Sequence, residues 1–105
     1  MTEFIVIFVT ASSPEEAQKI AHTLVEEKLA ACVNVLSPVQ SIFRWQNQLC
    51  NEQETLLILK TASSKANAVI ERVQHLHSYD VPEVIALPII TGSREYLNWV
   101  QSEIE

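Results

Sequence analysis

The densest group of chemically active side chains lies between residues 75 and 83. This short segment holds two imidazoles, a phenol and two carboxylic acids: His75, His77, Tyr79, Asp80 and Glu83. Such groups, placed so close together, can bind a cation or position a small polar ligand. They also have a structural explanation, because a histidine in the last turn of a helix interacts favourably with the helix dipole. Composition leaves both interpretations open.

A second group of candidate residues lies on either side of residue 50. Phe43 and Trp45 alternate with polar residues, so they form an aromatic pocket or pack against a neighbouring subunit. Glu54 and Lys60 flank an apolar run; we expect both to be solvated on an isolated subunit, and to line a cleft only at an interface.

Catalytic chemistry is the weakest of the functional hypotheses. No serine or cysteine is spaced with a histidine as nucleophile and base. Acid–base work by His77, Tyr79 and Glu83 is conceivable from their residue types, but the sequence names no substrate pocket for them. We therefore predict that the protein is not an enzyme.

The composition excludes several classes of function. The 105-residue chain has 7 basic and 13 acidic residues, a net charge of −6, and lacks the clustered positive charge that a nucleic-acid backbone needs. Its single glycine, Gly92, excludes a glycine-rich phosphate loop. No apolar run is long enough to span a membrane and no positively charged leader is evident, so we expect a cytoplasmic protein. We expect residues 1–105 to form one domain.

Two segments of the chain begin in the same way. An apolar run leads into Thr-Ala-Ser-Ser at residues 10–13, and another does so at residues 61–64. A helical pattern follows each of them. The first is indicated by Ser13, Pro14 and Glu16, which have the spacing of a capping box, and its apolar stripe extends to Val25. The second helix is predicted to begin near residue 64, and a third pattern predicts a C-terminal helix over residues 94–104.

Four apolar runs predict the strands of a sheet, at residues 4–9, 29–36, 56–59 and 84–90. Residues 37–54, between the second run and the third, predict a long hairpin with its turn near Asn47 and a bulge at Pro38. Two strand–helix–strand units of this length predict an α+β, ferredoxin-like fold. The extended hairpin and the C-terminal helix are additions to that plan.

The predicted strands are apolar on both faces. In a ferredoxin-like fold the helices cover one face of the sheet, and strands whose other face meets water should alternate apolar with polar residues. The run from Ile5 to Val9 does not alternate, and neither do the runs over residues 56–59 and 84–87. The economical cover for the second face is another copy of the chain, which would bury several apolar side chains. We therefore predict a homo-oligomer.

Several segments resemble the CutA family of divalent-cation tolerance proteins. The resemblance runs in register from about residue 5 to residue 100, and its most specific part is the His-x-Tyr-x-x-Pro-Glu block at residues 77–83 with the Ile-Ala-Leu-Pro strand that follows. The other matching segments are residues 30–35, 41–45, 54–61 and 96–100.

This resemblance implies a fold, an assembly and a role. The family is a ferredoxin-like homotrimer, similar in architecture to the PII signalling proteins, is associated with tolerance of copper and other divalent cations, and has no established enzymatic activity. Its recurrent polar and aromatic positions imply a ligand-binding cleft between subunits, formed here by Trp45, Glu54, Lys60, Tyr79 and Pro82. Contacts to a metal ion are predicted at His77 and Glu83.

The chain departs from the family pattern at several positions. It has Phe43 in place of the usual tyrosine, Asn47 in place of a turn glycine, and Ser78 in place of a proline. The copper site proposed in the bacterial branch uses a cysteine and two adjacent histidines, whose positions are held here by Val9, Leu76 and His77. One imidazole does not make a selective copper site. A divalent cation such as copper is thus a candidate cofactor, bound weakly at most.

Two functional hypotheses follow from the residues and the resemblance. The first is a cytoplasmic homotrimer that takes part in divalent-metal tolerance, with weak metal binding around His77 and Glu83. The alternative is a PII-like signalling or scaffold trimer that binds a small molecule or a protein partner in its intersubunit clefts. In this second case Trp45 would report on occupancy of the cleft by its fluorescence.

Overall fold

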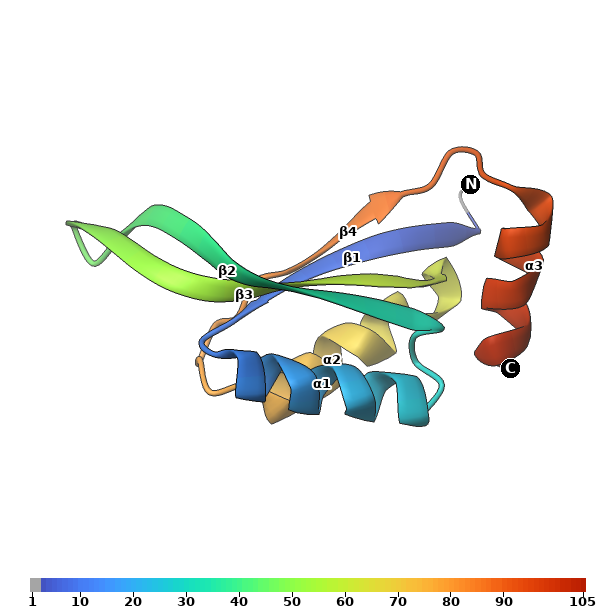
Figure 1. The fold of residues 1–105 in the computed structure, drawn as a ribbon, viewed down its shortest axis with the longest axis horizontal. Helices are drawn as coiled ribbons and strands as arrows, with labels where there is room; N and C mark the ends of the chain where they lie inside the picture. Colours follow the sequence, from blue (N-terminus) through green and yellow to red (C-terminus); the bar gives the residue numbers. More distant parts are fainter. Residues whose placement is uncertain (1–2) are drawn as a thin grey trace.

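A four-stranded antiparallel sheet with two helices on one face forms the body of the computed structural model (Figure 1). The model describes residues 3–105; residues 1 and 2, part of the segment predicted to lack a leader, lie outside them. The elements in chain order are β1 (Phe4–Ala11), α1 (Pro14–Glu26), β2 (Cys32–Trp45), β3 (Gln48–Ala62), a 3-10 turn (Ser63–Lys65), α2 (Ala66–Leu76), β4 (Val84–Pro88) and α3 (Arg94–Glu103).

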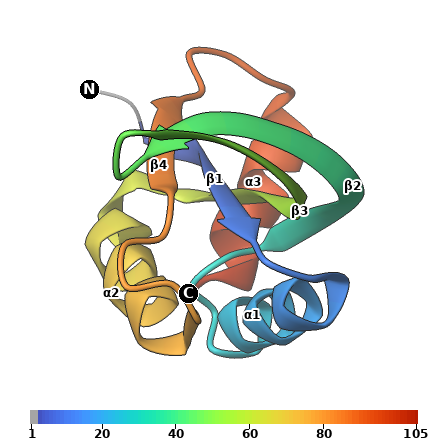
Figure 2. The ribbon, with the colours of Figure 1, turned by 90° about the vertical axis from the view of Figure 1, so that its left-hand side faces the viewer.

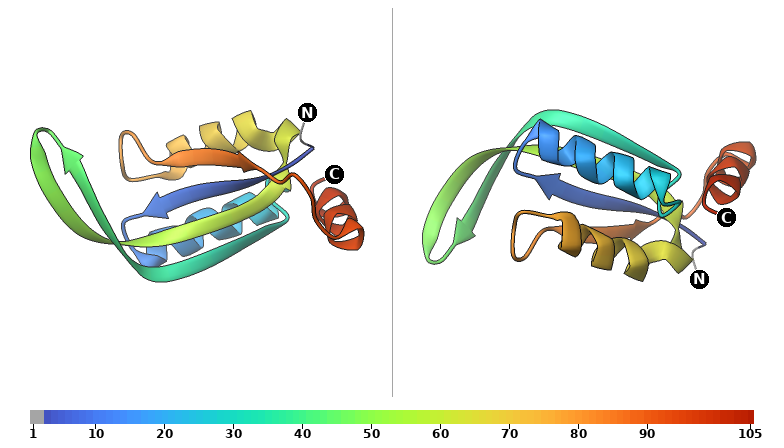
Figure 3. Two further views of the ribbon diagram at one scale, coloured as in Figure 1. Left: turned by 90° about the horizontal axis from the view of Figure 1, so that it is seen from above. Right: turned by 90° about the horizontal axis from the view of Figure 1, so that it is seen from below.

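The order of the strands in the sheet is β2-β3-β1-β4. Helices α1 and α2 lie side by side beneath this sheet, as the view along its long axis shows (Figure 2). Helix α3 packs across one end, while the β2–β3 hairpin extends beyond the helices at the other (Figures 1 and 3). The predicted ferredoxin-like plan, with its extended hairpin and C-terminal helix, is confirmed.

The core lies between the sheet and the two helices. Burial alternates along the uniformly apolar part of β1: Ile5, Ile7 and Val9 are buried in the core, whereas the residues between them are only partly buried. Burying a side chain of this size stabilises the fold by about 1.5–3 kcal/mol. Val25, the last residue of the stripe predicted for the first helix, is 41% exposed at the end of α1.

The two helix starts differ, although the sequence repeats before them. Helix α1 begins as predicted: the Glu16 backbone N–H donates to the Ser13 hydroxyl at 3.1 Å. The Glu16 carboxylate accepts from the backbone N–H of Ser12 at 2.9 Å, one residue earlier than in the usual capping box. Helix α2 starts with the 3-10 turn and has no side-chain cap.

The hairpin is continuous from the sheet to its tip. Strands β2 and β3 pair from Cys32 opposite Lys60 to Trp45 opposite Gln48, with a register shift where Pro38 was predicted to mark a bulge. The Ser37–Pro38 peptide bond is cis. At the tip, Gln46 and Asn47 adopt the left-handed φ values of 51° and 64° that a two-residue hairpin turn requires. The predicted turn is confirmed.

Within residues 3–105 no further layer covers the sheet face opposite the helices (Figure 3, left). Residues directly opposite in antiparallel strands share a face, so the register places apolar side chains together on it: Val6, Phe8, Leu36, Leu56, Ile58, Ile85 and Leu87. We call this the open sheet face. Ile85 is 51% exposed on it. The prediction of strands that are apolar on both faces is confirmed.

A search of the described helices finds none of the length and apolar character needed to cross a membrane.

Candidate functional site

A cavity of about 650 Å³ lies where the hairpin bends over the loop between α2 and β4. Hairpin and loop lie at the same end of the sheet, close to the end of β1, in both views of Figure 3. Four segments contribute side chains to the cavity, which are Thr10, Ser41, Ile42, Phe43, Trp45, Glu52, Glu54, Tyr79, Asp80, Val81 and Glu83. We call it the hairpin pocket.

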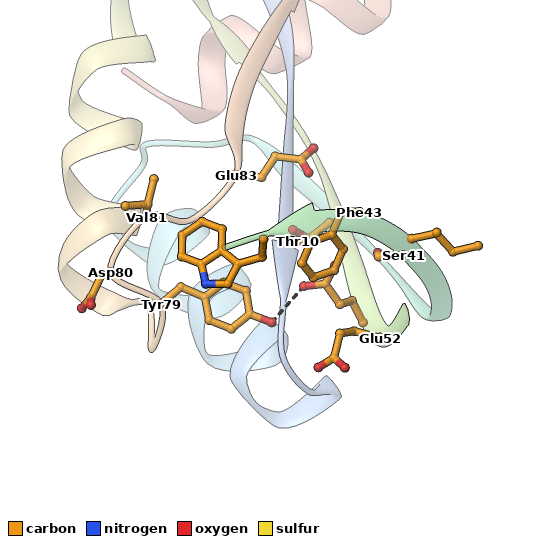
Figure 4. Close-up of a pocket in the computed structure, with 11 residues that line it drawn as sticks. Thr10, Ser41, Phe43, Glu52, Tyr79, Asp80, Val81 and Glu83 are labelled. Atoms are coloured by element: carbon orange, nitrogen blue, oxygen red, sulfur yellow. Dashed lines mark hydrogen bonds between the residues drawn. The ribbon is translucent and has the colours of Figure 1, made fainter. Parts of the chain in front are cut away.

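Glu54 and Tyr79 connect the two walls of the hairpin pocket. Glu54 pairs with Val39, next to the bulge in β2, and is only 8% exposed. The Tyr79 hydroxyl donates to its carboxylate at 2.9 Å, as the dashed line in Figure 4 shows. Burial, followed by this hydrogen bond, raises the pKa of Tyr79 to about 12. Tyr79 is therefore a protonated donor at neutral pH, which fixes Glu54 as its acceptor.

His77 lies behind the pocket wall and holds the loop in place. Its side chain is fully buried at the C-terminal end of α2. The ring Nε2 lies 2.7 Å from the carbonyl oxygen of Thr10, and the backbone N–H of Tyr79 donates to Nδ1 at 3.0 Å. A carbonyl oxygen can only accept, so this network assigns the hydrogen to Nε2 and the lone pair to Nδ1. Both ring nitrogens are thus used within the chain.

Glu16 joins the start of α1 to the same loop. Its carboxylate accepts from the backbone N–H of Ser78 at 2.7 Å, in addition to its hydrogen bonds with Ser12. Burial acts to raise the pKa of Glu16, but the hydrogen bonds from Ser12 and Ser78 outweigh it and lower the pKa to about 2. A carboxylate with several hydrogen-bond donors is favoured in its charged form. Glu16 and His77 therefore hold the loop from two sides.

The charges around the hairpin pocket are of one sign. Its lining includes the carboxylic acids Glu52, Glu54, Asp80 and Glu83 and, among the described residues, no lysine, arginine or histidine. Figure 4 shows the Asp80 carboxylate pointing away from the other labelled side chains. The remaining three acids and the aromatic side chains of Phe43, Trp45 and Tyr79 make the pocket both acidic and aromatic.

Most of the predicted cleft residues are brought together, but Lys60 and Pro82 do not line this pocket. Lys60 lies further along β3 from Glu54, by about 20 Å at about 3.3 Å per residue, and its ammonium group contacts Asn34 on β2. Trp45, Glu54, Tyr79 and Glu83 do line the pocket. The expectation that Glu54 is solvated on an isolated subunit is wrong, because the hairpin and the loop bury it within one chain.

Sequence reasoning missed Glu52, Ser41 and Thr10 as lining residues. A usable signal was present for the first two. With the turn at residues 46–47, the hairpin register places Ser41 opposite Glu52 and Val39 opposite Glu54. Residues at alternate positions share a face, so the turn predicts both acids on the face that carries Trp45.

The described side chains that could ligate a metal ion do not converge on a complete metal-binding centre. The described part of the chain contains no group of three or more histidine, cysteine, aspartate and glutamate side chains that could hold a metal ion. His77 has no unused ring nitrogen, and the lone pair of Nδ1 already accepts from Tyr79. The acids of the hairpin pocket are oxygen donors, which suit hard cations better than copper.

These features define a small ferredoxin-like α+β domain with an acidic pocket between an extended hairpin and the loop before its last strand. Residues 5–103 match the family model described as CutA1 divalent ion tolerance protein. The chain belongs to this family. It is 49% identical over 96 residues to the divalent-cation tolerance protein CutA of Thermus thermophilus, covering 91% of this chain and 93% of that protein.

A chloroplastic CutA protein of Arabidopsis thaliana is 45% identical over 98 residues, which cover 93% of this chain and 54% of that protein. Solved structures agree with the fold. The divalent cation tolerance protein of Thermus thermophilus superposes with a TM-score of 0.94 at 46% identity, covering 97% of this chain and 99% of that one. CutA from Xylella fastidiosa superposes with a TM-score of 0.96 at 39% identity, covering 99% of this chain and 100% of that one.

Proposed function

We propose that this protein acts in tolerance of divalent cations, and that the hairpin pocket is the site through which it does so. Membership of the CutA1 family carries the proposal. The concentration of acidic side chains in one pocket of an acidic protein supports it, because such a pocket attracts cations. The alternative of a PII-like signalling trimer finds no support in the comparisons.

Metal binding in this proposal is weak and depends on oxygen donors. Glu83 contributes a carboxylate, while His77 contributes by positioning the loop on which Glu83 lies. Binding of copper through His77 itself requires that Nδ1 give up its hydrogen bond from Tyr79. Titration calorimetry with copper and zinc tests the role of Glu83: Glu83→Gln is expected to weaken binding, and Glu26→Gln, which removes an exposed acid of α1, is the charge-matched control.

Growth under metal stress tests the function itself. A strain that lacks the gene is complemented with the wild-type protein, with the double variant Glu54→Gln/Glu83→Gln, or with Glu26→Gln, and challenged with copper and zinc salts. Wild type and Glu26→Gln are expected to restore growth, and the double variant is expected to restore less. Equal growth with and without the wild-type protein contradicts the role in tolerance.

The proposed assembly is a homotrimer, whose subunits cover one another's open sheet faces. The apolar side chains of this face support self-association, because stable interfaces bury about 1,200–2,000 Å² of surface, mostly of this character at the centre. The number of subunits, three, is taken from the family resemblance. We place the trimer in the cytoplasm, where its free cysteines, Cys32 and Cys50, would stay reduced. Cell fractionation tests this location.

A further inference from the structure

We propose that the hairpin pocket binds an organic ammonium ion, a molecule that carries protonated amines on an apolar chain. This goes beyond metal tolerance, because it assigns the pocket a ligand of a different chemical class. Three observations carry it: the charge of the lining, its aromatic side chains, and the misfit between the donors and a metal ion.

The charge of the lining selects a cation. Glu54 is 8% exposed, and the partner that its carboxylate has within the described chain is the neutral hydroxyl of Tyr79. Glu52 and Glu83 line the same cavity, to which no described residue contributes a positive charge. A bound cation would compensate the buried Glu54 carboxylate, which water screens less than it does the exposed Glu52 and Glu83.

The aromatic lining selects an organic cation over an inorganic one. Phe43, Trp45 and Tyr79 contribute their side chains to the cavity. Aromatic faces attract ammonium groups through the ring quadrupole and also bury the methylene groups attached to them. A hydrated metal ion gains little from such surfaces. Since the lining combines carboxylates with aromatic rings, it offers both a charged and an apolar contact to one molecule.

The size of the pocket and its donors agree with this choice. A cavity of about 650 Å³ lies within the range, about 300–1,000 Å³, of sites that bind small organic molecules. The described residues provide no cluster of three or more side chains able to ligate a metal. An organic ammonium ion does not need such a cluster of ligands, because each amine can donate hydrogen bonds to one or two carboxylates and to water.

Trp45 provides the measurement. The chain has two tryptophans, Trp45 and Trp99, so a Trp99→Phe background leaves Trp45 as the sole indole reporter. We expect protonated 1,4-diaminobutane to change its fluorescence saturably. The neutral 1,4-butanediol, a matched isostere, should produce no saturable change, and magnesium chloride should bind at least tenfold more weakly. Equal affinities for the diammonium ion and magnesium would show charge screening alone and overturn the proposal.

Variants locate the binding. In the same background, Glu54→Gln keeps an acceptor for Tyr79 and is expected to weaken diammonium binding at least tenfold, whereas Glu26→Gln removes the same charge elsewhere and should leave it unchanged. Should Glu54→Gln fail to fold by circular dichroism, the exposed Glu83 supplies Glu83→Gln as the second variant. Calorimetry with Trp45→Leu should also show weakened binding.

Two further results would overturn the proposal. One is the absence of diammonium binding to the wild-type protein, as expected if a side chain of a partner subunit fills the pocket. The other is equal binding by the wild type and Glu54→Gln/Glu83→Gln. Neither result decides the role in metal tolerance, which the growth assay measures separately.

Discussion

His77 and Thr10 are 67 positions apart in the chain and are joined by a hydrogen bond of 2.7 Å between the ring Nε2 and the backbone carbonyl oxygen. This contact fastens the loop after α2 to the end of β1. Because Thr10 and Tyr79 both line the hairpin pocket, the buried imidazole positions the loop side of the pocket relative to the end of β1.

Replacing this imidazole should destabilise the protein. In His77→Leu the carbonyl of Thr10 and the backbone N–H of Tyr79 both lose their partner; these groups are part-buried, and leaving each unpaired costs up to about 1–3 kcal/mol. We expect the free energy of unfolding, measured by urea titration, to fall by about 2–4 kcal/mol. The exposed His22 provides the control His22→Leu, for which about 0.5 kcal/mol or less is expected. Equal losses in the two variants would contradict this account.

The stability should depend on pH through Glu16. Its pKa in the folded protein is about 2, below the unfolded value of 4.5, so the folded state favours the charged form. The stabilisation is therefore complete above the unfolded pKa and is lost as the pH falls toward the folded one. Urea titrations at neutral pH and at about pH 3 should show a larger loss for the wild type than for Glu16→Gln. Glu15→Gln, a neighbouring exposed acid, should behave as the wild type does.

The Tyr79 phenol reports on the interior of the hairpin pocket. In a Tyr96→Phe background Tyr79 is the remaining tyrosine, and its ultraviolet absorbance should titrate with a pKa of about 12. Glu54→Gln removes the neighbouring charge and should lower this pKa toward the ordinary value of 10.0 without reaching it, because burial is the largest cause of the shift. A titration near 10 in both proteins would show that the pocket is open to water.

The fold could be predicted well from the sequence because the signals for its caps, turns and strands are local. The cap at Ser13, the turn at Asn47 and the bulge at Pro38 each depend on residues close together in the chain, and all three are present. The strands in which apolar residues do not alternate with polar ones also predicted the open sheet face correctly. These features need only periodicity and turn chemistry.

The contacts that shape the candidate site could not be predicted in the same way. The hydrogen bond from Ser78 to Glu16 joins residues 62 positions apart, and that from Tyr79 to Glu54 depends on how far the hairpin bends toward the loop. Neither contact leaves a periodic signal. For this reason His77 was predicted as a metal contact, whereas its position behind the wall, with both nitrogens hydrogen-bonded, becomes evident only in three dimensions.

The open sheet face leads to a prediction about assembly. Ile85→Glu introduces a charge at a position that is half-exposed on one subunit, so the single chain should still fold, while the charge would be buried unpaired between subunits at a cost of several kcal/mol. Sedimentation velocity at low micromolar concentration should find the wild type as a trimer and Ile85→Glu as a folded monomer. Val25→Glu, at the C-terminal end of α1 on the helix side of the sheet and 41% exposed, should remain a trimer. A wild-type protein that sediments as a stable monomer would show that the apolar face is tolerated in water and that copies of this chain do not cover it.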